Sequence, residues 1–282
     1  KDLFEKYGVE VPKTWAQFAA VAEAVHKQDP TVQITHFPQR DTGWFAGLAS
    51  QNGARWAQID GDKWLVNIDD APTEEVAKYW QNLIDRGLVA NMQGFSQQWN
   101  KALADGKLLT WVSAVWGNAT LASNVPTTSG KWALAPMPTW KDGEHTAANW
   151  GGSSTAVLRG SDHPYEAAQF ALWLNTDPDS LKLLNQNGGL YPATRAGLDL
   201  PFLKQPSPFY GGQHIFDVFA QAADNVDADF IWRPTMTQTY ASLADGFGAA
   251  LGGDSTLSEA LVGAQEDTIT AMRLQALEVE PK

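Results

Sequence analysis

The sequence of 282 residues contains no cysteine, so disulfides, thiol nucleophiles and cysteine-based metal sites are excluded. No two of its five histidines stand at metal-ligand spacing, and HExxH is absent. Phosphate-binding loops of the GxxxxGK[ST] and GxGxxG types are missing, as is the GxSxG nucleophile elbow. No apolar run approaches the roughly 20 residues of a membrane span. The sequence therefore predicts no metal and no cofactor, and it offers no catalytic motif.

Basic residues are also few. Twenty Lys and Arg stand against 32 Asp and Glu, which gives a net charge of −12. An acidic chain repels phosphate backbones and anionic lipid surfaces, so neither nucleic acid nor a membrane surface is an expected partner. The simplest consequence of this charge is solubility.

Tryptophan is abundant, with 13 residues, and so is glycine, with 24. An indole ring has a flat apolar face and a polar edge, which suits stacking on the C–H face of a sugar ring. Any single tryptophan can equally fill a core. The helical spacing of four of them predicts a structural role: Trp15, Trp80, Trp99 and Trp173.

Hydrophobic periodicity, capping residues and turn signals predict alternating helices and strands, which is typical of the α/β class. Helices dominate after residue 160. Helices are expected over 14–29, 43–52, 73–86, 96–105, 164–175, 178–187, 212–223, 235–250 and 256–277. Strands are expected over 32–37, 107–114, 132–136 and in the stretch ending at Leu158, with a hairpin over 59–66.

Four stretches, in this order, carry a resemblance to a known family. They are residues 1–18 (KDLFEKYGVEVPKTWAQF), 149–154 (NWGGSS), 188–193 (GGLYPA) and 257–261 (LSEAL) with Gln265. The sequence thereby resembles the extracellular sugar-binding proteins of bacterial ABC importers, which include maltose-binding protein. The resemblance runs from end to end of the chain.

The resemblance implies a type II periplasmic-binding-protein-like fold with two lobes and an incomplete first lobe. Residues 1–134 plus 190–282 would form the second lobe, and residues 135–189 would belong to the first. It also implies an oligosaccharide ligand held between lobes, delivery to the permease of an ABC transporter, and a monomer. The expected location is outside the cytoplasm, as a lipoprotein or a periplasmic protein whose signal sequence is not in this chain.

The same resemblance, together with residue chemistry, nominates ligand-binding residues. Trp116 follows a predicted strand, and ligands of open α/β sheets bind beyond strand ends. Trp150 precedes two glycines that let the backbone approach a ligand closely. Carboxylate chemistry adds Asp41, which together with Arg40 could bind sugar hydroxyls. The full set is Asp41, Trp44, Trp116, Trp150, Gly151, Gly152, Ser153, Tyr210, Gln213 and Tyr240, with weaker signals at Trp232 and Arg233.

Two other function classes stay open on the sequence. A glycosidase needs two carboxylates on either side of the scissile bond. Two acidic pairs, Asp69–Asp70 and Glu74–Glu75, lie where a helix is expected to begin. Their favourable interaction with the helix dipole explains their position better than a catalytic role does. A binder of a non-sugar solute, such as a peptide or polyamine, is the other alternative.

Overall fold

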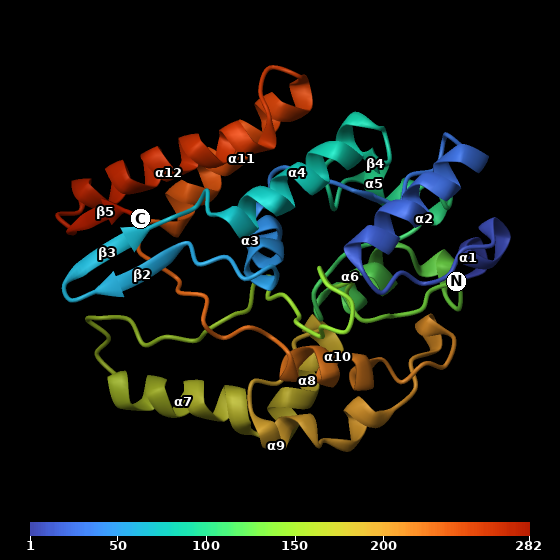
Figure 1. Ribbon diagram of the computed structural model, residues 1–282. Coiled ribbons are helices and arrows are strands. Elements are labelled where there is room, and N and C mark those ends of the chain that lie inside the picture. Colours follow the sequence, from blue (N-terminus) through green and yellow to red (C-terminus); the bar gives the residue numbers. More distant parts are fainter. The chain divides into compact units, whose positions relative to one another are not determined.

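The computed structural model describes residues 1–282, and their contacts divide the chain into two compact units. Unit 1 comprises Lys1–Asp2, Ser113–Pro136 and Gly151–Asp224. Unit 2 comprises Leu3–Val112, Met137–Trp150 and Asn225–Lys282 (Figure 1). No helix has the length and apolar character needed to cross a bilayer.

Unit 2 holds most of the secondary structure. Its helices are α1 (Asp2–Tyr7, apart from its first residue), α2 (Trp15–Gln28), α3 (Thr42–Gln51), α4 (Ala71–Asp85), α5 (Gln97–Ala104), α11 (Met236–Gly252) and α12 (Leu257–Leu274). Its strands are β1 (Thr35–His36), β2 (Ala57–Asp60), β3 (Lys63–Val66), β4 (Val89–Ala90) and β5 (Val279–Pro281).

Two small sheets organise unit 2. β1 and β4 pair in parallel, with His36 opposite Ala90, and residues 107–110 also run parallel to this stretch through a bridge between Gln33 and Leu108. β2 and β3 form the predicted antiparallel hairpin, and β5 adds to β3 in parallel. Strand pairing in the expected stretch 107–114 thus covers only its first half.

The core of unit 2 is aromatic. Trp80 is fully buried on α4, and its ring lies 4.8 Å from that of Trp44 and 5.8 Å from that of Trp15, measured between ring centroids. α11 and α12 lie along each other (Figure 1), and a Cβ on Gly246 would come within 2.5 Å of the Cβ of Ala260. Glycine at this position therefore permits the close packing of the two helices.

Several helix starts confirm their predicted caps. Thr14 accepts from the backbone N–H of Gln17 at 3.2 Å, and Thr256 forms a capping box with Glu259. The helix expected from Thr73 begins two residues earlier, at Ala71. The reason is that Asp70 caps it by accepting from the backbone N–H of Thr73 at 2.9 Å.

Unit 1 consists of helices and turns. Its elements are α6 (Gly117–Asn124), η1 (Pro126–Thr128), α7 (Pro164–Thr176), α8 (Pro178–Gly188), α9 (Arg195–Leu198), η2 (Pro201–Lys204), η3 (Pro208–Tyr210) and α10 (Ile215–Asp224). Its buried apolar side chains are few, and they include Leu121, Leu181, Leu203 and Phe219.

One face of unit 1 exposes large apolar side chains. α7 has no buried residue, and Phe170, Leu172 and Trp173 are 56%, 65% and 49% exposed. The prediction that Trp173 fills a core is wrong, because α7 packs beside α8 in a way that leaves Trp173 half exposed. The predicted strands over 132–136 and before Leu158 also do not form, because a strand needs a neighbouring strand to pair with and neither stretch pairs with one.

The compact units differ from the lobes expected from the sequence. Residues 113–134 and 190–224, expected with the second lobe, belong to unit 1, and residues 137–150, expected with the first lobe, belong to unit 2. Local contacts hold residues 190–224 in unit 1: the ring of Tyr191 stacks on that of Phe216, and Gln213 binds the backbone of Leu134. Residues 3–112, in contrast, all lie in unit 2, as do residues 225–282.

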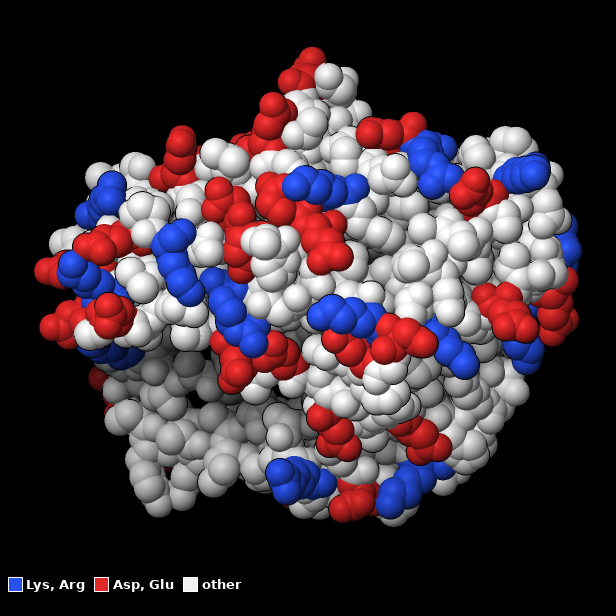
Figure 2. Space-filling model, viewed as in Figure 1, with Lys and Arg blue, Asp and Glu red and all other residues white.

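Charges of both signs are mixed on the face drawn in Figure 2. Blue and red side chains alternate along it, and the view shows no broad basic patch. Nucleic-acid-binding surfaces typically carry such a patch, so this face offers no electrostatic footprint for one.

Candidate functional site

The N-terminus of α3 gathers three of the predicted residues of unit 2. The indole N–H of Trp150 donates to Asp41 Oδ1 at 3.0 Å. A Cβ on Gly43 would lie 3.7 Å from Trp150 Cδ1 and 3.8 Å from Tyr240 Cζ, so both rings face this glycine. The hydroxyl of Thr42 donates to the carbonyl oxygen of Tyr240 at 3.1 Å, which ties α3 to α11. Asp41, Trp150 and Tyr240 are called the Asp41 group below.

Burial tunes the two titratable members of this group. It raises the pKa of Asp41, and the hydrogen bond from Trp150 acts in the opposite direction. It also raises the pKa of Tyr240 to about 12, against the lowering effect of Arg233. Tyr240 therefore keeps its phenolic proton at neutral pH. The group combines flat apolar rings with a carboxylate and a phenol, which are the chemical elements of carbohydrate recognition.

Trp44 lies elsewhere, inside the core of unit 2. Its side chain is 4% exposed, and its ring meets those of Phe37 and Trp80 at 5.8 and 4.8 Å. Its indole N–H donates to the carbonyl oxygen of Val112 at 3.2 Å. The prediction that Trp44 stacks on a ligand does not fit this position, because an enclosed ring has no open face to offer.

A second group of predicted residues belongs to unit 1. Trp116 is the N-cap residue of α6 and is half-buried, and a Cβ on Gly151 would lie 3.8 Å from its Nε1. Gly151 and Gly152 have φ angles of 81° and 123°, which L side chains rarely adopt, so glycine is required at both. Gly152 and Ser153 are exposed. Trp116, Gly151, Gly152 and Ser153 are called the Trp116 group.

Tyr210 and Gln213 have structural positions in unit 1. Tyr210 is 5% exposed, and burial raises the pKa of its phenol. The amide of Gln213 accepts from the backbone N–H of Leu134 and donates to its carbonyl oxygen, both at 2.8 Å. The predicted ligand contacts of these residues do not fit, because one ring is enclosed and the other side chain already pairs with the backbone.

The residues with weaker signals in the sequence differ in their exposure to solvent. Arg233 is 4% exposed, donates to Thr239 Oγ1 at 2.9 Å and lies over the ring of Trp56, and burial lowers its pKa to about 10. This guanidinium belongs to the interior. Trp232, in contrast, is 51% exposed beside Phe230, and Arg40 is exposed.

The sequence analysis missed a pocket of about 280 Å³ in unit 2. None of the ten nominated residues lines it. Trp232, one of the residues with a weaker signal in the sequence, does line it. A further signal was a set of small residues on one side of α3, where a Cβ on Gly47 would come within 2.7 Å of the carbonyl oxygen of Asn149. The lining consists of Ala46, Gly47, Ser50, Asn149, Val226, Asp227, Ala228, Phe230 and Trp232.

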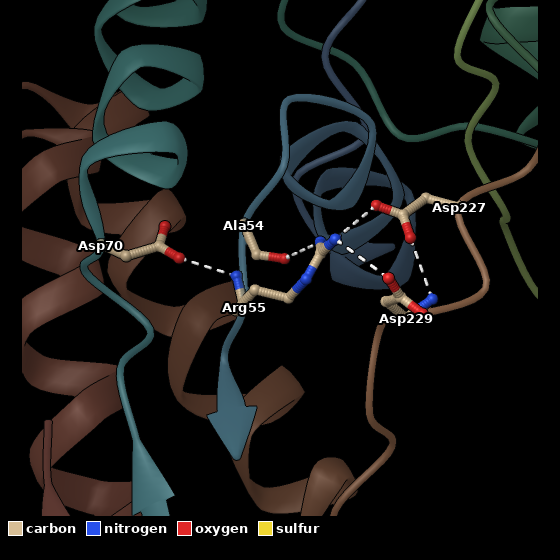
Figure 3. A network of polar contacts seen from close by, with 5 residues as sticks. All are labelled: Ala54, Arg55, Asp70, Asp227 and Asp229. Carbon is tan, nitrogen blue, oxygen red and sulfur yellow. Dashed lines mark hydrogen bonds and ion pairs between the residues drawn. The ribbon is translucent and has the colours of Figure 1, made fainter.

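A polar network fixes one wall of this pocket (Figure 3). Arg55 Nη2 binds Asp227 Oδ2 at 2.9 Å and lies 3.9 Å from Asp229 Oδ2. The backbone N–H of Arg55 donates to Asp70 Oδ2 at 2.7 Å. Arg55 thereby joins the loop of residues 227–229 to the start of α4.

Solved structures define the class of fold. The structure superposes with a TM-score of 0.89 on an ABC transporter associated binding protein from B. animalis subsp. lactis Bl-04, solved with β-1,6-galactobiose, at 27% identity. That match covers 99% of this chain and 71% of the other. The galacto-N-biose-/lacto-N-biose I-binding protein of the ABC transporter from Bifidobacterium longum, solved with lacto-N-biose, gives 0.88 at 28% identity, covering 99% and 68%. The fold is therefore the α/β fold of periplasmic binding proteins, as expected.

Sequence comparison names the family. The profile described as bacterial extracellular solute-binding protein matches residues 1–179. The chain belongs to this family, which confirms the resemblance. Among curated relatives, the arabinooligosaccharide-binding protein of Halalkalibacterium halodurans is 24% identical over an alignment of 280 residues, which covers 94% of this chain and 61% of the relative. The lactose-binding protein of Rhizobium radiobacter is 28% identical over 212 residues, 73% of this chain and 48% of the relative. The chain thus spans about half to two-thirds of their length.

Proposed function

We propose that this chain binds a short oligosaccharide without chemical change and serves in its delivery to the permease of an ABC transporter. The Asp41 group carries the proposal, because Trp150 is an indole held by a carboxylate beside the ring of Tyr240. Carbohydrates need such a combination of apolar faces and hydrogen-bonding groups. The relatives named as binding arabinooligosaccharide, lactose, β-1,6-galactobiose and lacto-N-biose support this ligand class.

The binding residues of this proposal are the Asp41 group and the Trp116 group. Trp150 and Trp116 supply stacking surfaces, Asp41 and Tyr240 supply an acceptor and a donor, and residues 151–153 supply an accessible backbone. Trp44, Tyr210 and Gln213 support these groups from within the fold. We infer that residues 1–134 and 190–282 form the second lobe of the family and that residues 135–189 belong to the first. The protein would act as a monomer outside the cytoplasm, in the periplasm or anchored as a lipoprotein.

A thermal-shift screen tests the proposal, because a ligand that binds only the folded state raises the melting temperature by mass action. The panel contains β-1,6-galactobiose, lacto-N-biose, lactose and arabino-oligosaccharides, with spermidine and a tripeptide as non-sugar controls. At least one oligosaccharide should raise the melting temperature in a saturable manner. No shift with any sugar, or a shift with spermidine or the peptide alone, would contradict the proposal.

Prolonged incubation separates binding from catalysis. The bound oligosaccharide should be recovered intact by chromatography after a day with a stoichiometric amount of protein. Recovery of monosaccharides in amounts exceeding the protein would instead identify a glycoside hydrolase.

A further inference from the structure

Three parallel stretches of unit 2 end at the same edge of a sheet. β1 ends at His36 and β4 at Ala90, and residues 107–110 run parallel to the stretch that leads into β1. Parallel strands have their carboxyl ends on one side, where open α/β sheets bind ligands. Asp41 follows the first of these ends, Phe95 the second and Trp111 the third.

The rings of Phe95 and Trp111 form the outer part of an aromatic cluster at this edge. Their centroids are 5.9 Å apart, and each ring also meets Trp99, at 5.4 Å from Phe95 and 5.0 Å from Trp111. Exposure increases outward: Trp99 is fully buried, Trp111 is half-buried and Phe95 is 44% exposed. The outer rings therefore rest on a fixed base.

That base is anchored by a buried hydrogen bond. The indole N–H of Trp99 donates to His36 Nδ1 at 3.1 Å, and His36 is 4% exposed. On its other side, His36 Nε2 would lie only 3.0 Å from a Cβ added to Gly94. The backbone that precedes Phe95 is thus pressed against the imidazole, and only a residue without a side chain fits there easily.

Phe95 itself has a costly backbone conformation. Its φ angle is 62°, which places a bulky L residue in the left-handed region that glycine or asparagine would adopt more easily. The ring is only partly buried, with 44% of the residue exposed, so burial offsets this strain only in part. Strain retained at an exposed aromatic residue is typical of functional positions.

The cluster is also connected to the Asp41 group. The carbonyl oxygen of Val112, the residue after Trp111, accepts a hydrogen bond from the indole N–H of Trp44 at 3.2 Å. Trp44 lies on α3, one residue after Gly43. The residue after Trp111 and the Asp41 group thus both contact α3.

We propose that Phe95 and Trp111 form a second carbohydrate-stacking surface of unit 2, which contacts a further sugar ring of the oligosaccharide. This inference rests on the proposed function and extends its site from the Asp41 group along the carboxyl edge of the sheet. Trp99 and Gly94 are positioning residues that hold the two rings, and they do not touch the ligand themselves.

The Phe95→Gly variant gives the sharpest test. Glycine relieves the left-handed backbone, but it also removes the contacts of the ring with Trp99 and Trp111 and frees the unfolded chain. These effects oppose each other, so the melting temperature should change little. Calorimetry should show affinity for the oligosaccharide found in the thermal-shift screen falling about 5- to 100-fold, the range known for stacking on aromatic rings. Trp111→Ala should lower the affinity in the same range, and Phe95→Tyr should retain it.

The matched control is Ile59→Ala, which removes a 57% exposed apolar side chain from β2 and should leave the affinity unchanged. Wild-type affinity in both Phe95→Gly and Trp111→Ala would overturn this inference and leave the proposed function intact. A wild-type protein that binds no oligosaccharide would contradict the proposed function, and this inference with it. A purely structural role of Phe95 would show as a lower melting temperature with unchanged affinity.

Discussion

Trp150 and Asp41, 109 residues apart in the sequence, are joined by a hydrogen bond of 3.0 Å from the indole N–H to the carboxylate. The bond helps to hold the tilt of a half-buried ring that also lies beside Gly43 at the start of α3. A stacking surface held in one orientation loses less conformational entropy when a ligand binds. The account of carbohydrate binding therefore depends on Asp41 as well as on the indole.

Replacing Asp41 should weaken binding through this ring. Asp41→Ala removes the acceptor, and we expect the affinity for the bound oligosaccharide to fall about tenfold, the equivalent of one charge-assisted hydrogen bond of about 1.5 kcal/mol. Asp41→Asn keeps a carbonyl acceptor and should recover part of the loss. Calorimetry measures both, and equal affinities for the wild type and the two variants would exclude this role of Asp41.

Gln213 should matter for stability and not for binding. Gln213→Ala leaves the backbone N–H and carbonyl oxygen of Leu134 without their 2.8 Å partners. Half-buried polar groups that lose their hydrogen bonds cost about 1–3 kcal/mol, so the denaturant midpoint should drop. The affinity of the remaining folded protein should equal that of the wild type. A loss of affinity at unchanged stability would restore Gln213 to the ligand site.

His36 should make folding sensitive to acid. Burial lowers its pKa from 6.5 to about 4, so the unfolded chain takes up a proton at a higher pH than the folded chain does. The contribution of the neutral imidazole to the free energy of unfolding is fully present above pH 6.5. It is lost as the pH falls toward 4, which lowers the free energy of unfolding by up to about 3 kcal/mol.

The His36→Gln variant tests this linkage, since it retains an acceptor for Trp99 but does not titrate. Its free energy of unfolding should change less than that of the wild type between pH 7 and pH 4. His163→Gln, at an exposed position, should follow the wild-type curve. Parallel curves for the wild type and His36→Gln would rule out a titrating His36.

The exposed side chains of α7 should form an apolar surface that contributes little to stability. The double variant Phe170→Ser with Leu172→Ser removes side chains that are 56% and 65% exposed. We expect less fluorescence from a dye that binds apolar surfaces, while the free energy of unfolding changes by about 0.5 kcal/mol or less. Phe247→Ala, in the core of unit 2, should instead cost about 3–5 kcal/mol. A large stability loss in the α7 variant would show that this helix is packed in solution.

Local signals in the sequence predicted nine of the twelve α-helices, whereas α1, α6 and α9 were not expected. A helix cap depends on a side chain and a backbone N–H three residues away, as at Thr14 and Thr256, so neighbouring residues determine it. A strand depends on a partner far away in the sequence. The stretch before Leu158 has strand-like composition but forms no ladder, and its composition cannot reveal this.

The candidate site was harder to predict for the same reason. Trp44 and Trp150 are both tryptophans beside glycine, yet one lies within a ring cluster of the core and the other beside Asp41 and Tyr240. Burial arises from packing between distant elements and leaves no mark in local spacing. Phe95 was missed because a left-handed φ angle at a phenylalanine has no sequence signature.

The most direct test of carbohydrate binding is calorimetric titration of one oligosaccharide from the screen into the wild type, Trp150→Ala and Trp116→Ala. We predict saturable binding at one site per chain for the wild type. Each variant should bind about 5- to 100-fold more weakly, in keeping with the loss of one stacking ring, while its melting temperature shows that it is folded. Wild-type affinity in both folded variants would contradict the claim that these indoles hold the sugar.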